Sequence, residues 1–179
     1  MRKKLLRVRN ISVYISLLIV TAVVSCSNSS QRSVELKRFP VDSLDGIITR
    51  SGAELDEDDS SDGKGSLRIK ARNAATVRLF EVNDLGVENA ILTYQAKLRS
   101  EDLIGMAYLE MRCHFPDGRE FFSSSPRAFL TGTTKWTAMQ TLFTLRKGER
   151  PDVVKLNLII EGKGTVWIDD IHLMKGPLV

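Results

Sequence analysis

An alternation of apolar and polar residues with a period of two runs through most of residues 34–179, and it constrains the fold more than any other feature. Within 106–115, every second residue from Ala107 to Phe115 is apolar, and the residues between them are mostly polar. Successive side chains of a strand point to opposite faces, so this pattern predicts a strand that buries one face. Similar patterns predict strands at 66–71, 76–82, 90–99, 119–123, 137–145, 153–161 and 165–174.

Residues that favour turns separate these segments. Residues 116–118 (Pro-Asp-Gly) predict a hairpin turn, and residues 162–164 (Gly-Lys-Gly) predict a tight connection before the last strand. Residues 100–103 indicate one capped helical turn, and no segment sustains a helical apolar stripe. About nine short strands without helices predict an all-β domain, an antiparallel β-sandwich.

The first 26 residues follow a different pattern. Five basic residues precede an apolar run at 11–24, which leads into Ser25 and Cys26, and no acidic residue lies before Cys26. This resembles the signal of bacterial lipoproteins, which is cut before a cysteine that carries the lipid. An ordinary cleaved signal and an uncleaved anchor are the alternatives, although the run is shorter than the roughly 20 apolar residues that span a bilayer. Ser27, where an Asp would signal inner-membrane retention, implies the outer membrane in a host with two membranes.

This resemblance divides the chain into three parts: a signal peptide at 1–25, a lipidated cysteine with a polar tether at 26–33, and one domain at 34–179. The whole chain has a net charge of +4, from 26 basic and 22 acidic residues. Five of the basic residues belong to the signal, so the rest carries 21 basic against 22 acidic residues, a net charge of −1. The basic composition therefore gives no reason to expect a nucleic-acid partner. Cys113 is the second cysteine of the chain, which excludes a fold stapled by disulfides.

The C-terminal third carries a more specific motif. Residues 164–173 read Gly-Thr-Val-Trp-Ile-Asp-Asp-Ile-His-Leu, and residues 63–69 read Gly-Lys-Gly-Ser-Leu-Arg-Ile. Over about residues 40–175 the chain resembles the jelly-roll carbohydrate-binding modules of the galactose-binding-like fold, in the manner of families 4 and 9. The resemblance implies a structural calcium ion, held by backbone oxygen near Lys64 and by the carboxylate of Asp169 or Asp170. It also implies that Trp136 and Trp167 pack as core residues near the sheet ends; stacking platforms for a ligand are the alternative.

A sugar-binding face is the first functional hypothesis. Tyr108, Glu110 and Arg112 lie opposite the apolar side of 106–115, and Gln95 and Asn157 hold the same position on 90–99 and 153–161. If these strands share a sheet, their planar polar groups and one aromatic ring suit sugar hydroxyls and C–H faces. A solvated face of cross-strand ion pairs is the alternative. Of Phe121 and Phe122, neighbours on one strand, at most one faces inward.

Neither histidine lies in a nucleophile or metal-ligand motif, and the sequence does not predict an enzyme. We therefore expect an envelope lipoprotein whose domain binds a glycan without catalysis. The alternative is a structural or assembly lipoprotein whose sandwich docks another envelope protein. A concave groove in which Tyr108, Arg112, Gln95 and Asn157 converge would favour sugar. A flat face of paired charges, or a groove filled by a loop, would favour docking.

Overall fold

The computed structural model describes residues 33–125 and 127–178, so the predicted signal, Cys26 and all but the end of the predicted tether lie outside it. The described residues form eight strands, and they contain no helix that could cross a membrane. The strands are β1 (Val34–Phe39), β2 (Ala53–Asp56), β3 (Ser66–Ala71), β4 (Ala75–Asn83), β5 (Ala90–His114), β6 (Glu120–Ser124), β7 (Leu130–Leu145) and β8 (Val153–Gly176).

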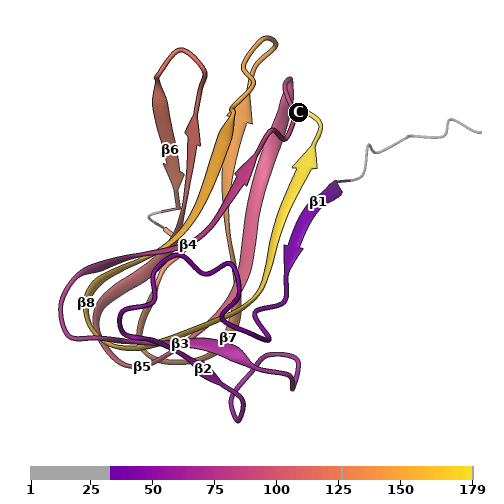
Figure 1. Cartoon of the computed structure of the whole chain (residues 1–179). Helices are drawn as coiled ribbons and strands as arrows, with labels where there is room; N and C mark the ends of the chain where they lie inside the picture. Colours follow the sequence, from indigo (N-terminus) through magenta and orange to yellow (C-terminus); the bar gives the residue numbers. More distant parts are fainter. Residues whose placement is uncertain (1–32, 126, 179) are drawn as a thin grey trace, which may run out of the picture.

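Two long strands, β5 and β8, organise the fold. They pair antiparallel over nearly their whole lengths, from Ile91 opposite Gly176 to His114 opposite Val153. Midway, the register shifts between Glu101 and Ile104, and Figure 1 shows both strands curving together there. Each strand therefore contributes one half to each of two layers.

We call these layers the first and the second layer. The first layer contains β1, the C-terminal half of β8, the N-terminal half of β5, and β7, in that order. The second layer contains β4, the N-terminal half of β8, the C-terminal half of β5, and β6. At the bend, β3 pairs with residues 164–168 of β8, and β2 pairs with β3. All these pairs are antiparallel, as the alternation predicts.

Two glycines, which have no Cβ, allow the strands to approach closely at the bend. Gly105 and Gly162 face each other in the register, with φ of 111° and 145°. A Cβ on Gly105 would overlap the carbonyl oxygen of Glu161, and one on Gly162 would overlap that of Ile104. The predicted tight connection at 162–164 and the predicted capped turn at 100–103 are therefore wrong, because both segments continue their strands through the bend.

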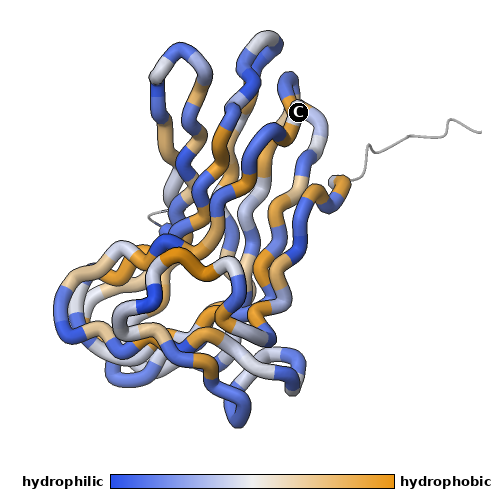
Figure 2. The backbone as a smooth tube through the Cα atoms, viewed as in Figure 1, coloured by the Kyte–Doolittle hydropathy of each residue, from blue (hydrophilic) through white to orange (hydrophobic). Residues whose placement is uncertain are grey.

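The core lies between the two layers. The inward residues of β5 are almost completely buried on both sides of the bend, in the alternation that the sequence shows. In Figure 2 apolar and polar residues alternate along the strands. The buried apolar residues form one cluster that draws on both halves of β5 and of β8. The prediction of an all-β antiparallel sandwich is confirmed.

Candidate functional site

The outer face of the second layer brings together four of the five predicted sugar contacts. Tyr108, Glu110 and Arg112 project from β5, and Asn157 of β8 lies opposite Glu110 in the register. Gln95 is not among them: it lies on the N-terminal half of β5, between strands of the first layer. The bend separates the two halves of β5, so the strands 90–99 and 106–115 do not share one outer face.

Glu110 is the centre of a buried polar network. Its side chain is only 8% exposed. Arg112 donates to both carboxylate oxygens, with Nε 2.7 Å from Oε1 and Nη2 3.1 Å from Oε2, and Asn157 Nδ2 donates to Oε1 at 3.0 Å. The hydrogen bond to Glu110 is the main reason that the pKa of Arg112 is raised. A two-pronged contact of this kind fixes the plane of the guanidinium group as well as its position.

Strand β6 extends this network. Glu120 accepts a hydrogen bond from Lys155 Nζ at 2.6 Å and one from Arg112 Nη1 at 3.3 Å. The hydrogen bond from Lys155 is the main influence lowering the pKa of Glu120. Phe122 pairs with Arg112, is 61% exposed, and has its ring centre 5.3 Å from the guanidinium carbon of Arg112. The sequence left open which of the two neighbouring phenylalanines faces outward, because that depends on the register of β6 against β5.

Tyr108 lies farther along the same face. Its hydroxyl donates to Glu161 Oε1 at 2.7 Å. Burial, followed by this hydrogen bond, raises the pKa of Tyr108 to about 12. Arg112 follows Tyr108 by four positions on β5, which is about 13 Å along an extended strand. The face therefore has an aromatic ring toward each end and a row of polar groups between them.

The charges on this face are paired with one another. Glu110 and Glu120 bind Arg112 and Lys155, and Gln95 does not converge with them. By the criterion drawn from the sequence, paired charges favour docking. Arg112 is still 38% exposed, however, and can donate further hydrogen bonds to a ligand. The face can therefore offer fixed donors, acceptors and two aromatic rings.

The predicted calcium ligands lie on the first layer, near the bend. Asp170 is close to three cationic or ionisable side chains: Arg38 at 2.9 Å, Lys97 at 3.4 Å and His172 at 2.9 Å. Burial alone would raise the pKa of Asp170, but the hydrogen bonds from Arg38 and His172 lower it overall. These partners make Asp170 a poor ligand for a cation. The third predicted ligand is backbone oxygen near Lys64. In the structure the backbone N–H of Lys64 donates to Asp62 at 3.1 Å.

Asp169 has a different environment. It is fully buried, and its carboxylate accepts hydrogen bonds from the backbone N–H groups of Ser61, at 2.8 Å, and Asp170, at 2.6 Å. The nearby Ser61 hydroxyl is buried without a hydrogen-bond partner. Within residues 33–125 and 127–178, no three His, Cys, Asp or Glu side chains are grouped to hold a metal. Of the predicted set, Asp169 alone fits a cation, and oxygen atoms of the 57–65 loop would have to complete its ligands.

That loop covers the end of the first layer's outer face. Trp167 Nε1 donates to Asp56 at 2.9 Å, and the guanidinium group of Arg99 lies 4.2 Å from the centre of the Trp167 ring. Trp136 Nε1 donates to Asp59 at 3.1 Å. Trp167 is buried and Trp136 half-buried, but neither belongs to the hydrophobic cluster between the layers. Both tryptophans therefore pack against this loop.

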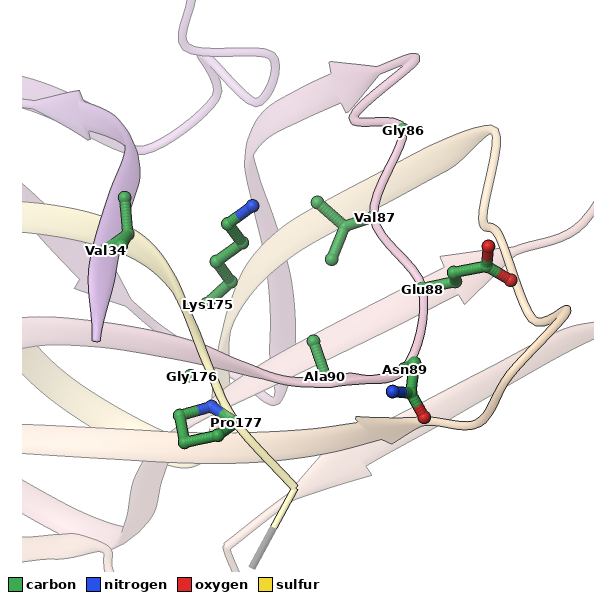
Figure 3. A pocket seen from close by; sticks show the side chains of 9 residues that line it. All are labelled: Val34, Gly86, Val87, Glu88, Asn89, Ala90, Lys175, Gly176 and Pro177. Carbon is green, nitrogen blue, oxygen red and sulfur yellow. The ribbon is translucent and has the colours of Figure 1, made fainter. Parts of the chain in front are cut away.

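A hollow lies where β1 begins and β8 ends. It has a volume of about 460 Å³ and is lined by Val34, Gly86, Val87, Glu88, Asn89, Ala90, Lys175, Gly176 and Pro177. Figure 3 shows the ammonium group of Lys175 between Val34 and Val87. The Glu88 carboxylate is held by the Gly148 N–H and by Arg150. No aromatic ring lines this hollow, so it lacks the surface on which a sugar ring stacks.

Comparison with solved structures finds similar folds among binding modules. The family 22 xylan-binding domain from Paenibacillus barcinonensis Xyn10C has a TM-score of 0.60 at 15% identity, covering 84% of this chain and 100% of that one. The C-terminal family 22 module of Clostridium thermocellum Xyn10B has a TM-score of 0.55 at 15% identity, covering 81% and 96%. A family 16 carbohydrate-binding module has a TM-score of 0.53 at 15% identity, covering 73% and 91%.

No protein-family model matches the sequence, and neither does any curated protein. At about 15% identity, similarity of structure establishes the fold and leaves the ligand open. The described residues form a β-sandwich whose fold is similar to that of these modules.

Proposed function

We propose that the protein binds a carbohydrate, without transforming it, on the outer face of the second layer. The observation that carries this proposal is the exposed ring of Phe122 beside the network of Arg112, Glu110 and Asn157. A sugar ring would stack on Phe122, and its hydroxyl groups would meet a guanidinium group whose orientation is already fixed. The fold shared with xylan-binding domains supports this function, and the motif at 164–173 supports a closer likeness to families 4 and 9.

A glycan array, followed by titration calorimetry with the bound glycans, tests this function. We expect Phe122→Ala and Tyr108→Ala each to weaken binding about 10-fold, because loss of a stacked ring costs roughly 1–2 kcal/mol. Gln95→Ala is the matched control on the first layer and should bind as the unmodified protein does. Failure to bind any glycan, with or without calcium, would end the carbohydrate proposal.

Docking of another envelope protein is the second candidate, and the paired charges around Glu110 favour it. A photoreactive amino acid in place of Phe122 would report the partner in living cells, with the same substitution at Gln95 as the control. A protein crosslinked at position 122 but not at position 95, in a chain that binds no glycan, would establish docking. Absence of a crosslink at position 122, in a chain that binds a glycan, would favour sugar.

Anchoring by a lipid on Cys26, in the outer membrane of a host with two membranes, belongs to the same proposal. The apolar run at 11–24, the small Ser25 before the cysteine and the Ser27 after it support it. Mass spectrometry of the N-terminal peptide should find Cys26 as the first residue, carrying acyl chains. Cys26→Ala should leave the signal uncut and the chain without acyl groups, and fatty-acid labelling that persists in this variant would contradict lipid anchoring at this residue.

A structural calcium ion at Asp169 is also proposed. The buried carboxylate without a cationic partner supports it, as does the unpaired Ser61 hydroxyl. Removing a bound ion with a chelator should lower the melting temperature, and added calcium should restore it, since a ligand of the folded state stabilises that state. Asp169→Asn should abolish this difference. An identical melting temperature with chelator and with calcium would show that the fold holds no such ion.

A further inference from the structure

The two layers leave a hollow between them at the edge formed by β6 and β7. Its volume is about 270 Å³, and we call it the edge hollow. It is lined by Phe115, Phe121, Phe143, Thr144, Arg146 and Glu149. Phe121 comes from the second layer and Phe143 from the first, so the hollow opens between the inner faces of the sandwich.

Three aromatic rings form its apolar wall. Phe121 pairs with the buried Cys113 and so points to the inner side of its layer, yet it is 48% exposed. Phe115 packs edge-to-face against Phe121, with ring centres 6.0 Å apart and planes at 68°. Phe143 pairs with the buried Leu92 and is half-buried. An inward-pointing aromatic ring that remains half exposed presents a flat apolar surface to a ligand.

Polar groups surround this wall. The backbone N–H of Arg146 donates to Glu149 Oε2 at 2.8 Å, which holds the Glu149 carboxylate at the hollow. The guanidinium group of Arg119 lies 5.7 Å from the ring centre of Phe121 and 5.8 Å from that of Phe115. The hollow therefore combines ring faces with donors and acceptors, which is what a sugar's C–H face and hydroxyl groups require.

We propose that the edge hollow is a second carbohydrate subsite that accepts one sugar ring, such as the end of a chain. This proposal rests on the proposed function. At about 270 Å³ the hollow is smaller than the roughly 300–1,000 Å³ that holds a drug-sized ligand, which favours a single ring over a chain. An apolar peptide side chain fits less well, because it would desolvate the Arg146 and Glu149 groups without pairing them.

Adjacent residues supply matched variants. Phe121 and Phe122 are neighbours on β6 and point to opposite faces, and both are about half exposed. Phe121→Ala removes a ring from the edge hollow, and Phe122→Ala removes one from the outer face of the second layer. Both variants shorten the same side chain on the same edge strand, so their effects on folding should be similar. Melting temperatures of the two proteins check this directly.

The probes are xylose, glucose, galactose and their linear oligomers, measured by NMR titration of the purified protein. We expect Phe121→Ala to weaken monosaccharide binding about 5- to 10-fold and to leave the Phe122 contribution to oligomer binding intact. Phe122→Ala should weaken oligomer binding and leave monosaccharide binding unchanged. If Phe121→Ala fails to fold, Glu149→Ala removes the carboxylate at the same hollow and should give the same loss.

The outcomes separate this proposal from the function on which it rests. Monosaccharide binding unaffected by both Phe121→Ala and Glu149→Ala would overturn the edge hollow and leave the outer face standing. Loss of all binding in Phe121→Ala, together with unchanged binding in Phe122→Ala, would support the hollow and overturn the outer face. Resonance shifts at the hollow with an apolar peptide, and with no sugar, would overturn the proposal in favour of a protein partner.

Discussion

Asp56→Asn tests how the 57–65 loop is held against the sandwich. Asp56 is buried, and its two carboxylate oxygens accept four hydrogen bonds. Oδ2 accepts from Trp167 Nε1 at 2.9 Å and from Arg68 Nη1 at 3.1 Å, and Oδ1 accepts from the backbone N–H groups of Asp58 and Asp59 at 3.2 Å. Asparagine keeps the shape of the side chain but replaces one acceptor oxygen by an NH₂ group.

Whichever way the amide turns, its NH₂ group will face N–H donors. An unpaired buried donor costs about 1–3 kcal/mol, and the charge that faces Arg68 is lost as well. We expect the free energy of unfolding to fall by about 3 kcal/mol. For a domain of this size the melting temperature should then fall by roughly 6–12 °C. Urea unfolding followed by tryptophan fluorescence measures the loss directly.

The loss should depend on pH. The hydrogen bond from Trp167 is the main cause of the lowered pKa of Asp56. A carboxyl whose folded pKa lies below its unfolded value of about 3.9 adds stability above pH 3.9, and that stability disappears as the pH falls through the folded pKa. The difference between Asp56→Asn and the unmodified protein should therefore be largest near pH 7 and shrink below pH 4.

Asp58→Asn is the matched control, since Asp58 is exposed on the same loop. It should change the free energy of unfolding by less than about 0.5 kcal/mol. Trp167→Phe removes the donor instead of the acceptor, so its effect should not add to that of Asp56→Asn. Equal losses for Asp56→Asn and Asp58→Asn, or a loss independent of pH, would refute this account of the loop.

Four further changes test the fold. Gly162→Ala should prevent folding, because its Cβ would meet a backbone carbonyl, whereas Gly118→Ala, with open space around it, should cost about 1 kcal/mol in urea unfolding. Ser100→Ala should cost about 1–3 kcal/mol by the same assay, because the buried hydroxyl donates to a backbone carbonyl at 3.0 Å. Tyr94→Phe should be neutral or raise the melting temperature, because the buried hydroxyl has no partner. Burial raises the pKa of Cys113 to about 12, so peptide mapping should find its thiol unalkylated at pH 8 until the protein unfolds.

The alternating sequence predicted the core well because a strand has only two faces. Once one residue of 106–115 is inside, the period of two places the rest, and Leu109, Met111 and Cys113 are indeed buried. The same reasoning placed Tyr108, Glu110 and Arg112 together on the outside. Asn157 lies on the same face because its strand pairs with theirs in the second layer.

The bend could not be predicted from the local sequence. A Gly-Lys-Gly segment suits a tight turn as well as it suits a strand that bends around a close neighbour. The difference depends on Gly105, which is more than 50 residues away and approaches Gly162 across the strand pair. Because the local sequence does not reveal the bend, it groups Gln95 with residues of the other layer. The outward position of Phe122 likewise required the register of β6.

The fold also places both proposed sugar sites away from the point where the chain enters the domain. β1 pairs with β8 at one side of the first layer, whereas β7 forms the other side of that layer and β6 the corresponding side of the second. Figure 1 shows β1 and β6 at opposite sides of the molecule. A lipid on Cys26 would be joined to the domain through β1. The membrane attachment would then lie across the sandwich from Phe121 and Phe122, so anchoring and binding of a glycan are sterically compatible.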